Sequence, residues 1–296
     1  MKTLFFLMPM LIFSQGEFNK KRSNLLAKES LKKPFDKLSG IHVRKKSPGS
    51  SDWLFTHKEA GQSFLEYQRF VKVKKGKKYK YIYVKQIGDF SKNQLKVAEL
   101  SKQYLSLYFN CKVEAMKPMA VNRIPPKYKR KQFGTQQILS TYVLYNILKP
   151  RRPKDALAVI ALCSSDLWPG KGWNFVYGQA SLRERIGVWS IHRNGNPDKQ
   201  FATCLRRTIK TATHETGHIL GLKHCITYEC NMNGSNHMAE SDNTPLALCP
   251  VCLKKLSWNV NSKPLERYKK LANFCKTNKL EKEMKFFNRS IKILSK

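Results

Sequence analysis

Acidic residues are scarce in this 296-residue chain: Asp and Glu number 20, whereas Lys and Arg number 56, which gives a formal net charge of +36. The deficit directs attention to anionic partners such as nucleic acid or a membrane surface. The basic residues are nevertheless spread along the whole chain, with local clusters at 72–80, 127–131 and 149–154. We therefore interpret them as a lysine-rich solvated surface. Nucleic acid is not an expected partner, association with a membrane surface stays open, and a monomer is expected.

The apolar run at the N-terminus is short. It covers residues 4–13, whereas a helix that spans a bilayer needs about 20 apolar residues. A permanent anchor is therefore not expected, and because no Cys follows the run, a lipid-modified start is not indicated either. Lys2 before the run and the small residues Ser14 and Gly16 after it predict a signal peptide over residues 1–16 and a secreted or periplasmic protein. The alternatives are a buried N-terminal segment and a cytoplasmic location.

Internal repeats and low-complexity tracts are also lacking, which argues against an architecture of stacked repeats. Residues 17–78 are rich in Lys and interrupted by Pro34, Pro48 and Gly49. For this stretch we predict a basic, loosely ordered N-terminal segment with one short helix near residues 62–70.

Regular periodicity begins at Tyr79. Strands are predicted at 79–87, 111–116, 156–163, 173–181 and 186–193. Helices are predicted from Ser91, from Thr135 to Leu148 and from Thr203 to Leu220, with a proline-rich loop at 117–134. The alternation of strands and helices predicts an α/β fold with a mixed, mainly parallel sheet. The catalytic domain is expected to span residues 79–275, and residues 276–296 form a basic, amphipathic tail that we interpret as a solvated helix.

The helix predicted at 203–220 has one apolar side. At 100° per residue, six side chains fall in a single stripe: Leu205, Ile209, Ala212, Thr216, Ile219 and Leu220. His214 and His218 fall on the opposite side. Because they point away from the predicted core, they are not explained as packed core histidines, and a role as metal ligands is favoured.

His214 and His218 are four residues apart, so both imidazoles can reach one ion from the same helix face. Glu215 lies between that face and the apolar stripe, where its carboxylate can bond a water activated by the metal. A catalytic zinc keeps three protein ligands and one open position. Gly221 can end the helix with a positive φ and reverse the chain, which brings His224 back as the third ligand. The sequence therefore predicts catalytic zinc on His214, His218 and His224, with Glu215 as general base.

The motif HExxHxxGxxH is that of the metzincin zinc proteases, and residues 214–232 together with 248–256 resemble the archaemetzincins in particular. The resemblance extends to residues 52–64, 166–193 and 266–271, so it covers about residues 51–272. It implies a metzincin-like zincin domain with an active-site helix, a peptidase site and two zinc ions. It further implies that Met232 forms an apolar floor beneath the catalytic zinc and that an edge strand within residues 179–191 pairs with substrate backbone.

Four of the eight cysteines are clustered near the active-site motif: Cys225, Cys230, Cys249 and Cys252. Their spacing, C-x4-C and then C-x2-C, is close to that of structural zinc sites, so we predict a C-terminal zinc subsite held by four cysteines. Two local disulfides are the alternative, because an exported protein can oxidise its thiols. Bound zinc on Cys225 would also restrain the loop that carries His224.

These features predict a zinc metalloprotease that hydrolyses peptide bonds. The resemblance suggests action from the N-terminus of short peptides as one option. Such an aminopeptidase needs an acidic group for the substrate amine, and Glu240 and Asp242 are candidates by proximity alone. The competing hypothesis is a basic zinc-ribbon protein that binds nucleic acid and has a vestigial histidine site.

Overall fold

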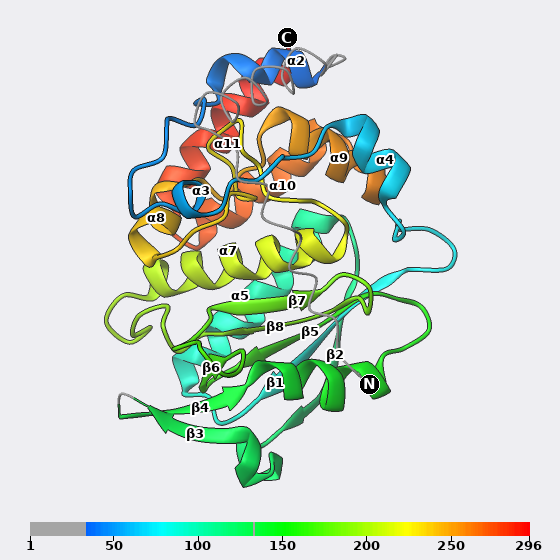
Figure 1. Cartoon of the computed structure of the whole chain (residues 1–296). Coiled ribbons are helices and arrows are strands. Elements are labelled where there is room, and N and C mark those ends of the chain that lie inside the picture. The colour runs from blue at the N-terminus through cyan, green and yellow to red at the C-terminus, as the bar shows by residue number, and fades with distance from the viewer. Residues whose placement is uncertain (1–33, 133) are drawn as a thin grey trace.

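The computed structural model describes residues 34–132 and 134–296 (Figure 1). Its main sheet has five strands in the order β2-β1-β5-β8-β7. The strands are β1 Tyr81–Ile87, β2 Val113–Met119, β5 Ala156–Cys163, β7 Gly178–Ser181 and β8 Ile186–Ser190. All neighbours are parallel except β7, which runs antiparallel to β8 and lies at the edge. The predicted mixed, mainly parallel sheet is confirmed.

The central strand β5 is buried along its whole length because both faces of the sheet are covered. On one face, Ile160 and Leu162 pack with the helices α5 Lys92–Phe109 and α7 Phe201–Ile219. On the other face, Val159 and Ala161 pack with residues of the helical segment Ser140–Leu148. The candidate site is on the α7 side of the sheet.

A second, three-stranded sheet was not expected from the sequence. It consists of β3 Lys129–Gln132, β4 Thr135–Leu139 and β6 Asp166–Trp168, in the order β3-β4-β6. The helix predicted from Thr135 is wrong in its first turn, because helical structure starts only at Ser140. The side chain of Gln137 donates to Asp166 Oδ2 at 2.7 Å, so pairing with a distant strand overrides the local helical spacing.

The remaining elements between β2 and β5 in the sequence are short. They are the 3-10 helices η2 Val121–Arg123, η3 Pro126–Tyr128 and η5 Lys149–Arg151, the helical turn α6 Ser140–Tyr142 and the π-helix η4 Val143–Leu148. Ser91 is the N-cap of helix α5, as the sequence predicts, and the side chain of Gln94 completes a capping box with it. The helix ends at Asn110, whose φ of 45° is left-handed.

The described part of the N-terminal segment, residues 34–78, is more ordered than its sequence suggests. It contains α2 Phe35–Leu38, η1 Ser39–Ile41, α3 Trp53–Thr56 and α4 Phe64–Phe70, the last being the short helix predicted there. Leu38, Leu54 and Tyr67 are fully buried. Isolated anchors at irregular spacing leave no periodic pattern in the sequence, which explains why the packing was not predicted. The predicted signal peptide, residues 1–16, lies outside the described residues.

The C-terminal third is helical, with α8 Met238–Asn243, α9 Pro250–Val260, α10 Pro264–Thr277 and α11 Glu281–Leu294. These helices lie on the side of α7 that faces away from the sheet (Figure 1). The prediction of a solvated tail is wrong, because α11 packs against α10, buries Phe287 and pairs Glu283 with Arg206 Nε at 2.6 Å. Within the described residues, no helix is both long enough and apolar enough to cross a membrane.

Candidate active site and metal centres

The histidines predicted as metal ligands come together at the end of α7. The candidate ligand atoms of His214, His218 and His224 all lie within 4.8 Å of one another. The Nε2 atoms of His214 and His218 are 3.0 Å apart, close to the roughly 3.3 Å edge of a tetrahedron built on zinc–nitrogen bonds of about 2 Å. The donor set and its spacing therefore fit a zinc ion.

Local sequence explains how α7 presents the first two histidines. The apolar stripe predicted along this helix is buried, whereas His214 and His218 are half-buried on the other face. The helix ends where Gly221 adopts a φ of 87°, and Leu222 N then donates back to Gly217 O at 3.0 Å. This turn directs the chain toward His224.

The imidazoles of His214 and His218 are oriented by hydrogen bonds from Nδ1, the nitrogen that does not face the metal position. The Nδ1 atom of His214 donates to Asn231 O at 2.8 Å, and that of His218 donates to Leu222 O at 2.7 Å. Since a carbonyl oxygen can only accept, both rings carry their proton on Nδ1, and both Nε2 lone pairs are free to bind a metal.

The two helical histidines are held in their neutral form. Burial lowers the pKa of His218 to about 3, and burial with the nearby charges of the other two histidines lowers the pKa of His214 well below its usual range. Neutral imidazole is the form that binds zinc, so the environment favours ligation over protonation.

Glu215 lies beside the histidines with its carboxylate against the edge strand. A Cβ atom added to Gly178 of β7 would come within 3.0 to 3.2 Å of the outer atoms of Glu215, so a larger residue there would require the Glu215 side chain to shift. Burial raises the pKa of Glu215 to about 7. A carboxyl group with this pKa can take and release a proton near neutral pH.

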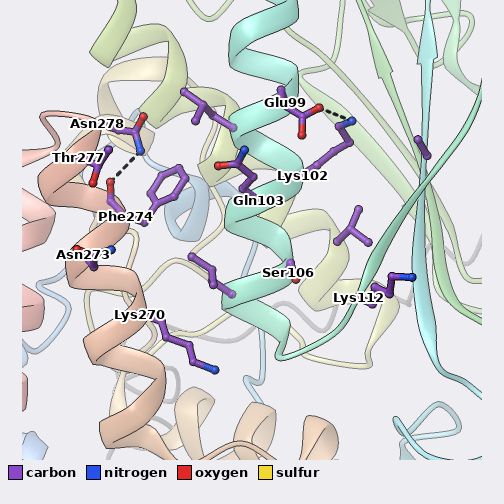
Figure 2. A pocket seen from close by; sticks show the side chains of 14 residues that line it. Glu99, Lys102, Gln103, Ser106, Lys112, Lys270, Asn273, Phe274, Thr277 and Asn278 are labelled. Atoms are coloured by element: carbon purple, nitrogen blue, oxygen red, sulfur yellow. Dashed lines mark hydrogen bonds and ion pairs between the residues drawn. The ribbon is translucent and has the colours of Figure 1, made fainter.

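Glu215 and His214 line a hollow of about 100 Å³. The lining also includes the basic residues Arg207, Lys210 and His237. Glu215 is the one acidic residue among the lining residues. A larger hollow of about 650 Å³ lies between α5 and α10 (Figure 2), but its lining contains no His or Cys, so it has no part in the candidate site.

The carboxylate next to His224 was missed by sequence reasoning. Glu59 Oε1 accepts from Nδ1 of His224 at 2.8 Å, and it also accepts from Nε1 of Trp53 at 3.1 Å. Although burial opposes it, the hydrogen bond and charge of His224 lower the pKa of Glu59 below its usual value. Residues 52–64 were noted in the sequence for their resemblance alone, and nothing there indicated which side chain reaches the site.

Met232 lies beneath α7, where the resemblance implies an apolar floor. Its side chain is 1% exposed, and a Cβ atom on Gly217 would come within 2.6 Å of its sulfur. Met232 O also accepts from Cys225 N at 2.7 Å. Met232 is thus hydrogen-bonded to Cys225, the residue that follows His224.

The four clustered cysteines form a second candidate metal centre. All four are buried, and their sulfurs lie within 4.8 Å of one another. The sulfurs of Cys225 and Cys249 are 3.7 Å apart, too long for a disulfide and close to the roughly 3.8 Å edge of a zinc–thiolate tetrahedron. Backbone N–H groups of Cys249 and Met232 point at Cys230 Sγ, at 3.2 and 3.5 Å. All eight cysteines are free thiols, so the geometry fits zinc and not two local disulfides.

Hydrogen bonds from Cys230, Cys249 and Cys252 hold the pKa of Cys225 well below its usual range. This sulfur is therefore the one most readily present as a thiolate, the form that binds zinc. The same residue directly follows His224 in the chain.

A third group of side chains that could bind a metal consists of Asp52, His237 and Glu240. Glu240 and His237 are engaged in hydrogen bonds from backbone N–H groups. The Glu240 carboxylate accepts from Trp53 N at 3.0 Å and from Asn236 N at 2.8 Å. His237 Nδ1 accepts from Glu240 N and caps α8. We assign this cluster to holding α3 and α8 together.

The two acidic candidates for binding a substrate amine are engaged elsewhere. Glu240 holds backbone N–H groups, and Asp242 pairs with Arg207 Nη2 at 2.6 Å. Neither residue lines the hollow beside Glu215.

Comparisons with known proteins agree with this geometry. A family model described as Peptidase family M54 matches residues 128–258. Archaemetzincin-2 of Mus musculus is 31% identical over 76% of this chain and 72% of that protein, and Archaemetzincin-2 of Homo sapiens is 32% identical over the same shares. The crystal structure of archaemetzincin from Methanopyrus kandleri has 28% sequence identity and a TM-score of 0.51, covering 62% of this chain and 97% of that chain.

The likeness to curated relatives extends well beyond the active-site motif, because it covers 76% of this chain. The M54 match includes both the histidine and the cysteine clusters. The chain therefore belongs to the archaemetzincin family, peptidase family M54 of the metzincins, and is a zinc metallopeptidase.

Proposed function

We propose that His214, His218 and His224 hold the catalytic zinc ion and that Glu215 is the general base of peptide-bond hydrolysis. The observation that carries this proposal is the convergence of the three imidazoles on one point beside a carboxylate. When bound, zinc supplies Lewis acidity, which acidifies a water molecule and polarises the substrate carbonyl.

The protein's own residues would then move the proton. Glu215 takes it from the attacking water and delivers it to the leaving amine. Burial favours the protonated form of Glu215, so the group can hold a proton between the two steps and release it afterwards. The three Nδ1 hydrogen bonds keep the imidazoles in one tautomer throughout the reaction.

For the substrate, we propose an extended peptide that adds to the outer edge of β7. This strand pairs with β8 on one side and is last in the sheet order, so its other edge can accept a strand. Gly178 of the same strand adjoins Glu215, which would place the bond to be cleaved near the base.

An aminopeptidase-like preference finds no support in the lining of the hollow. A free amine needs an acidic partner, and Glu215, which is reserved for the proton transfer, is the one acid there. We therefore propose that cleavage does not require a free N-terminus.

The four-cysteine cluster is proposed to hold a second, structural zinc ion. Four buried sulfurs close the coordination sphere, so this ion would stabilise the fold and leave no position for substrate.

A matched set of variants tests the proposal. Glu215→Gln should lower peptide cleavage by about 10²- to 10⁴-fold while the protein retains two zinc ions, and Glu266→Gln, on the exposed face of α10, should change neither quantity. Peptide libraries with free and acetylated N-termini should be cleaved alike. Wild-type turnover by Glu215→Gln would refute the role of this residue as general base.

We also propose export of the protein, on the basis of the predicted signal peptide at residues 1–16. Free thiols outside a reducing compartment risk oxidation, but the four unclustered cysteines are buried. Burial raises the pKa of Cys111 and Cys204 to about 11, which leaves little reactive thiolate. The mass of the mature N-terminus tests the proposal, because a chain that keeps residues 1–16 would contradict it.

A further inference from the structure

The third histidine of the candidate zinc site depends on the N-terminal segment of the chain. We infer that Glu59 is a positioning residue of the catalytic centre, because its carboxylate holds the His224 ring so that Nε2 faces the shared metal position. The inference rests on the proposed function, in which His224 is a zinc ligand.

The three histidines differ in what orients them. His214 and His218 donate to backbone carbonyls that lie 17 and 4 residues further along the chain. His224 donates to a side chain 165 residues upstream, with Nδ1 at 2.8 and 3.0 Å from the two carboxylate oxygens of Glu59. The orientation of this third ring is therefore set by tertiary structure and not by its own loop.

A carboxylate does more than a carbonyl in this position. As an ionised acceptor it requires the proton of His224 to be on Nδ1, which leaves the Nε2 lone pair for the metal. Its negative charge also raises the basicity of the ring and strengthens it as a ligand. Removal of the charge is therefore expected to weaken zinc binding even where the hydrogen bond survives.

Trp53 holds Glu59 in place. The indole Nε1 donates to Glu59 Oε1 at 3.1 Å, and the ring meets the edge of His224 with centroids 5.3 Å apart. The indole lies against Gly234, where an added Cβ would come within 2.4 Å of it. Carboxylate, indole and imidazole thus form one contact chain.

The same segment also binds the turn between α7 and His224. Gln62 Nε2 donates to Gly221 O at 3.1 Å, and Lys223 N donates to Gln62 Oε1 at 3.3 Å. The hydroxyl of Tyr67, which is fully buried, donates to Leu220 O at 2.8 Å. Residues 53–67 therefore fix both the backbone that leads to His224 and the ring itself.

Zinc affinity of the full-length chain tests the inference directly. We expect Glu59→Gln to weaken the histidine site by about 10- to 100-fold in competition with a chromophoric chelator, with the cysteine-bound zinc retained. The visible absorption of cobalt bound at the histidine site should shift as well, because the ligand field changes. Trp53→Phe keeps an aromatic ring at this position but removes the Nε1 donor, and it should cause a smaller loss of zinc affinity.

Glu66→Gln is the matched control. Glu66 belongs to the same segment and completes the capping box of α4 with Ser63, but it does not contact a histidine. A Gln at this position can still accept from Ser63 N, but the loss of negative charge at the start of α4 should lower the melting temperature slightly. Zinc affinity and the cobalt spectrum should stay those of wild type. If the role of Glu59 were purely structural, Glu59→Gln would likewise lower the melting temperature without changing zinc affinity or the cobalt spectrum.

The outcomes separate the two claims. If wild type binds two zinc ions, His218→Ala loses one, and Glu59→Gln binds both with wild-type affinity, the positioning role is wrong and the zinc site stands. If His218→Ala has the zinc content of wild type, the proposed function fails and the inference fails with it. Should Glu59→Gln not fold, unchanged affinity in Trp53→Phe would overturn the inference.

Discussion

The sulfur atoms of Cys225 and Cys249 lie 3.7 Å apart, and Cys225 is joined to His224 by a single peptide bond. The candidate structural centre and the candidate catalytic centre therefore share one short stretch of backbone. Whatever fixes Cys225 also limits where the imidazole of His224 can go. An ion bound by the cysteines would thus restrain the backbone next to His224, whereas Glu59 holds the imidazole ring through Nδ1.

The first prediction follows from this adjacency. Cys249→Ala should remove the structural zinc and also weaken zinc at the histidine site by about 10-fold or more, because the loop after His224 loses its anchor. Metal content per chain, measured after dialysis against a weak chelator, should fall from two ions to fewer than one.

Cys275→Ala serves as the control, because Cys275 is a buried thiol outside the cluster. It should keep both ions. Loss of one ion from Cys249→Ala, with the other held as tightly as in wild type, would show that the two centres are independent.

The second prediction concerns the order in which the ions leave. The histidines are half-buried and His214 borders a hollow, whereas all four cysteines are buried. Chelator should therefore remove the histidine-bound ion first, with loss of activity and little change in the melting temperature. Removal of the second ion should unfold the C-terminal part, since structural zinc contributes to folding. Simultaneous loss of both ions at every chelator concentration would contradict this order.

Much of the site was predictable because its signals are local. The apolar run at 156–163 forms β5 over the predicted residues, since a strand buried on both faces has no polar position. The stripe on α7 and the glycine at 221 likewise placed His214, His218 and the turn to His224. In each case the residues that form the sequence pattern lie within a few positions of the structural feature that they predict.

What could not be predicted depends on distant partners. Thr135–Leu139 became a strand because Gln137 and its neighbours pair with β6, although their own spacing suits a helix. Glu59 looks like any carboxylate in a Lys-rich segment, and only the folded chain brings it to His224. No periodicity or spacing rule connects residues 165 positions apart.

The third prediction concerns the buried carboxylate of Asp166, which connects the small sheet to Arg193. Asp166 of β6 is fully buried and accepts from Arg193 at 2.9 and 2.8 Å and from Gln137 at 2.7 Å. Asp166→Asn leaves the guanidinium without its counter-charge and should reduce the free energy of unfolding by about 2 to 4 kcal/mol. Denaturant titration measures the loss.

The exposed pair of Lys269 and Glu266 gives the contrast. Glu266→Gln should change the free energy of unfolding by less than about 0.5 kcal/mol, because solvent screens such a pair. If Asp166→Asn were as mild as Glu266→Gln, the buried pair would not stabilise the contact between the sheets.

The fourth prediction concerns the space that Gly178 leaves for Glu215. The Cβ of Gly178→Ala would come within 3.0 Å of Glu215 Cγ and 3.1 Å of its Oε1. The side chain of Glu215 is easier to move than the backbone of β7, so the fold and zinc content should be retained while kcat falls by about 10- to 100-fold. Gly40→Ala is the control, because an added Cβ there meets no atom within 4 Å. The effect should vanish in a Glu215→Gln background, where there is no base left to displace. A Gly178→Ala enzyme with wild-type kcat would mean that Glu215 works equally well from a displaced position.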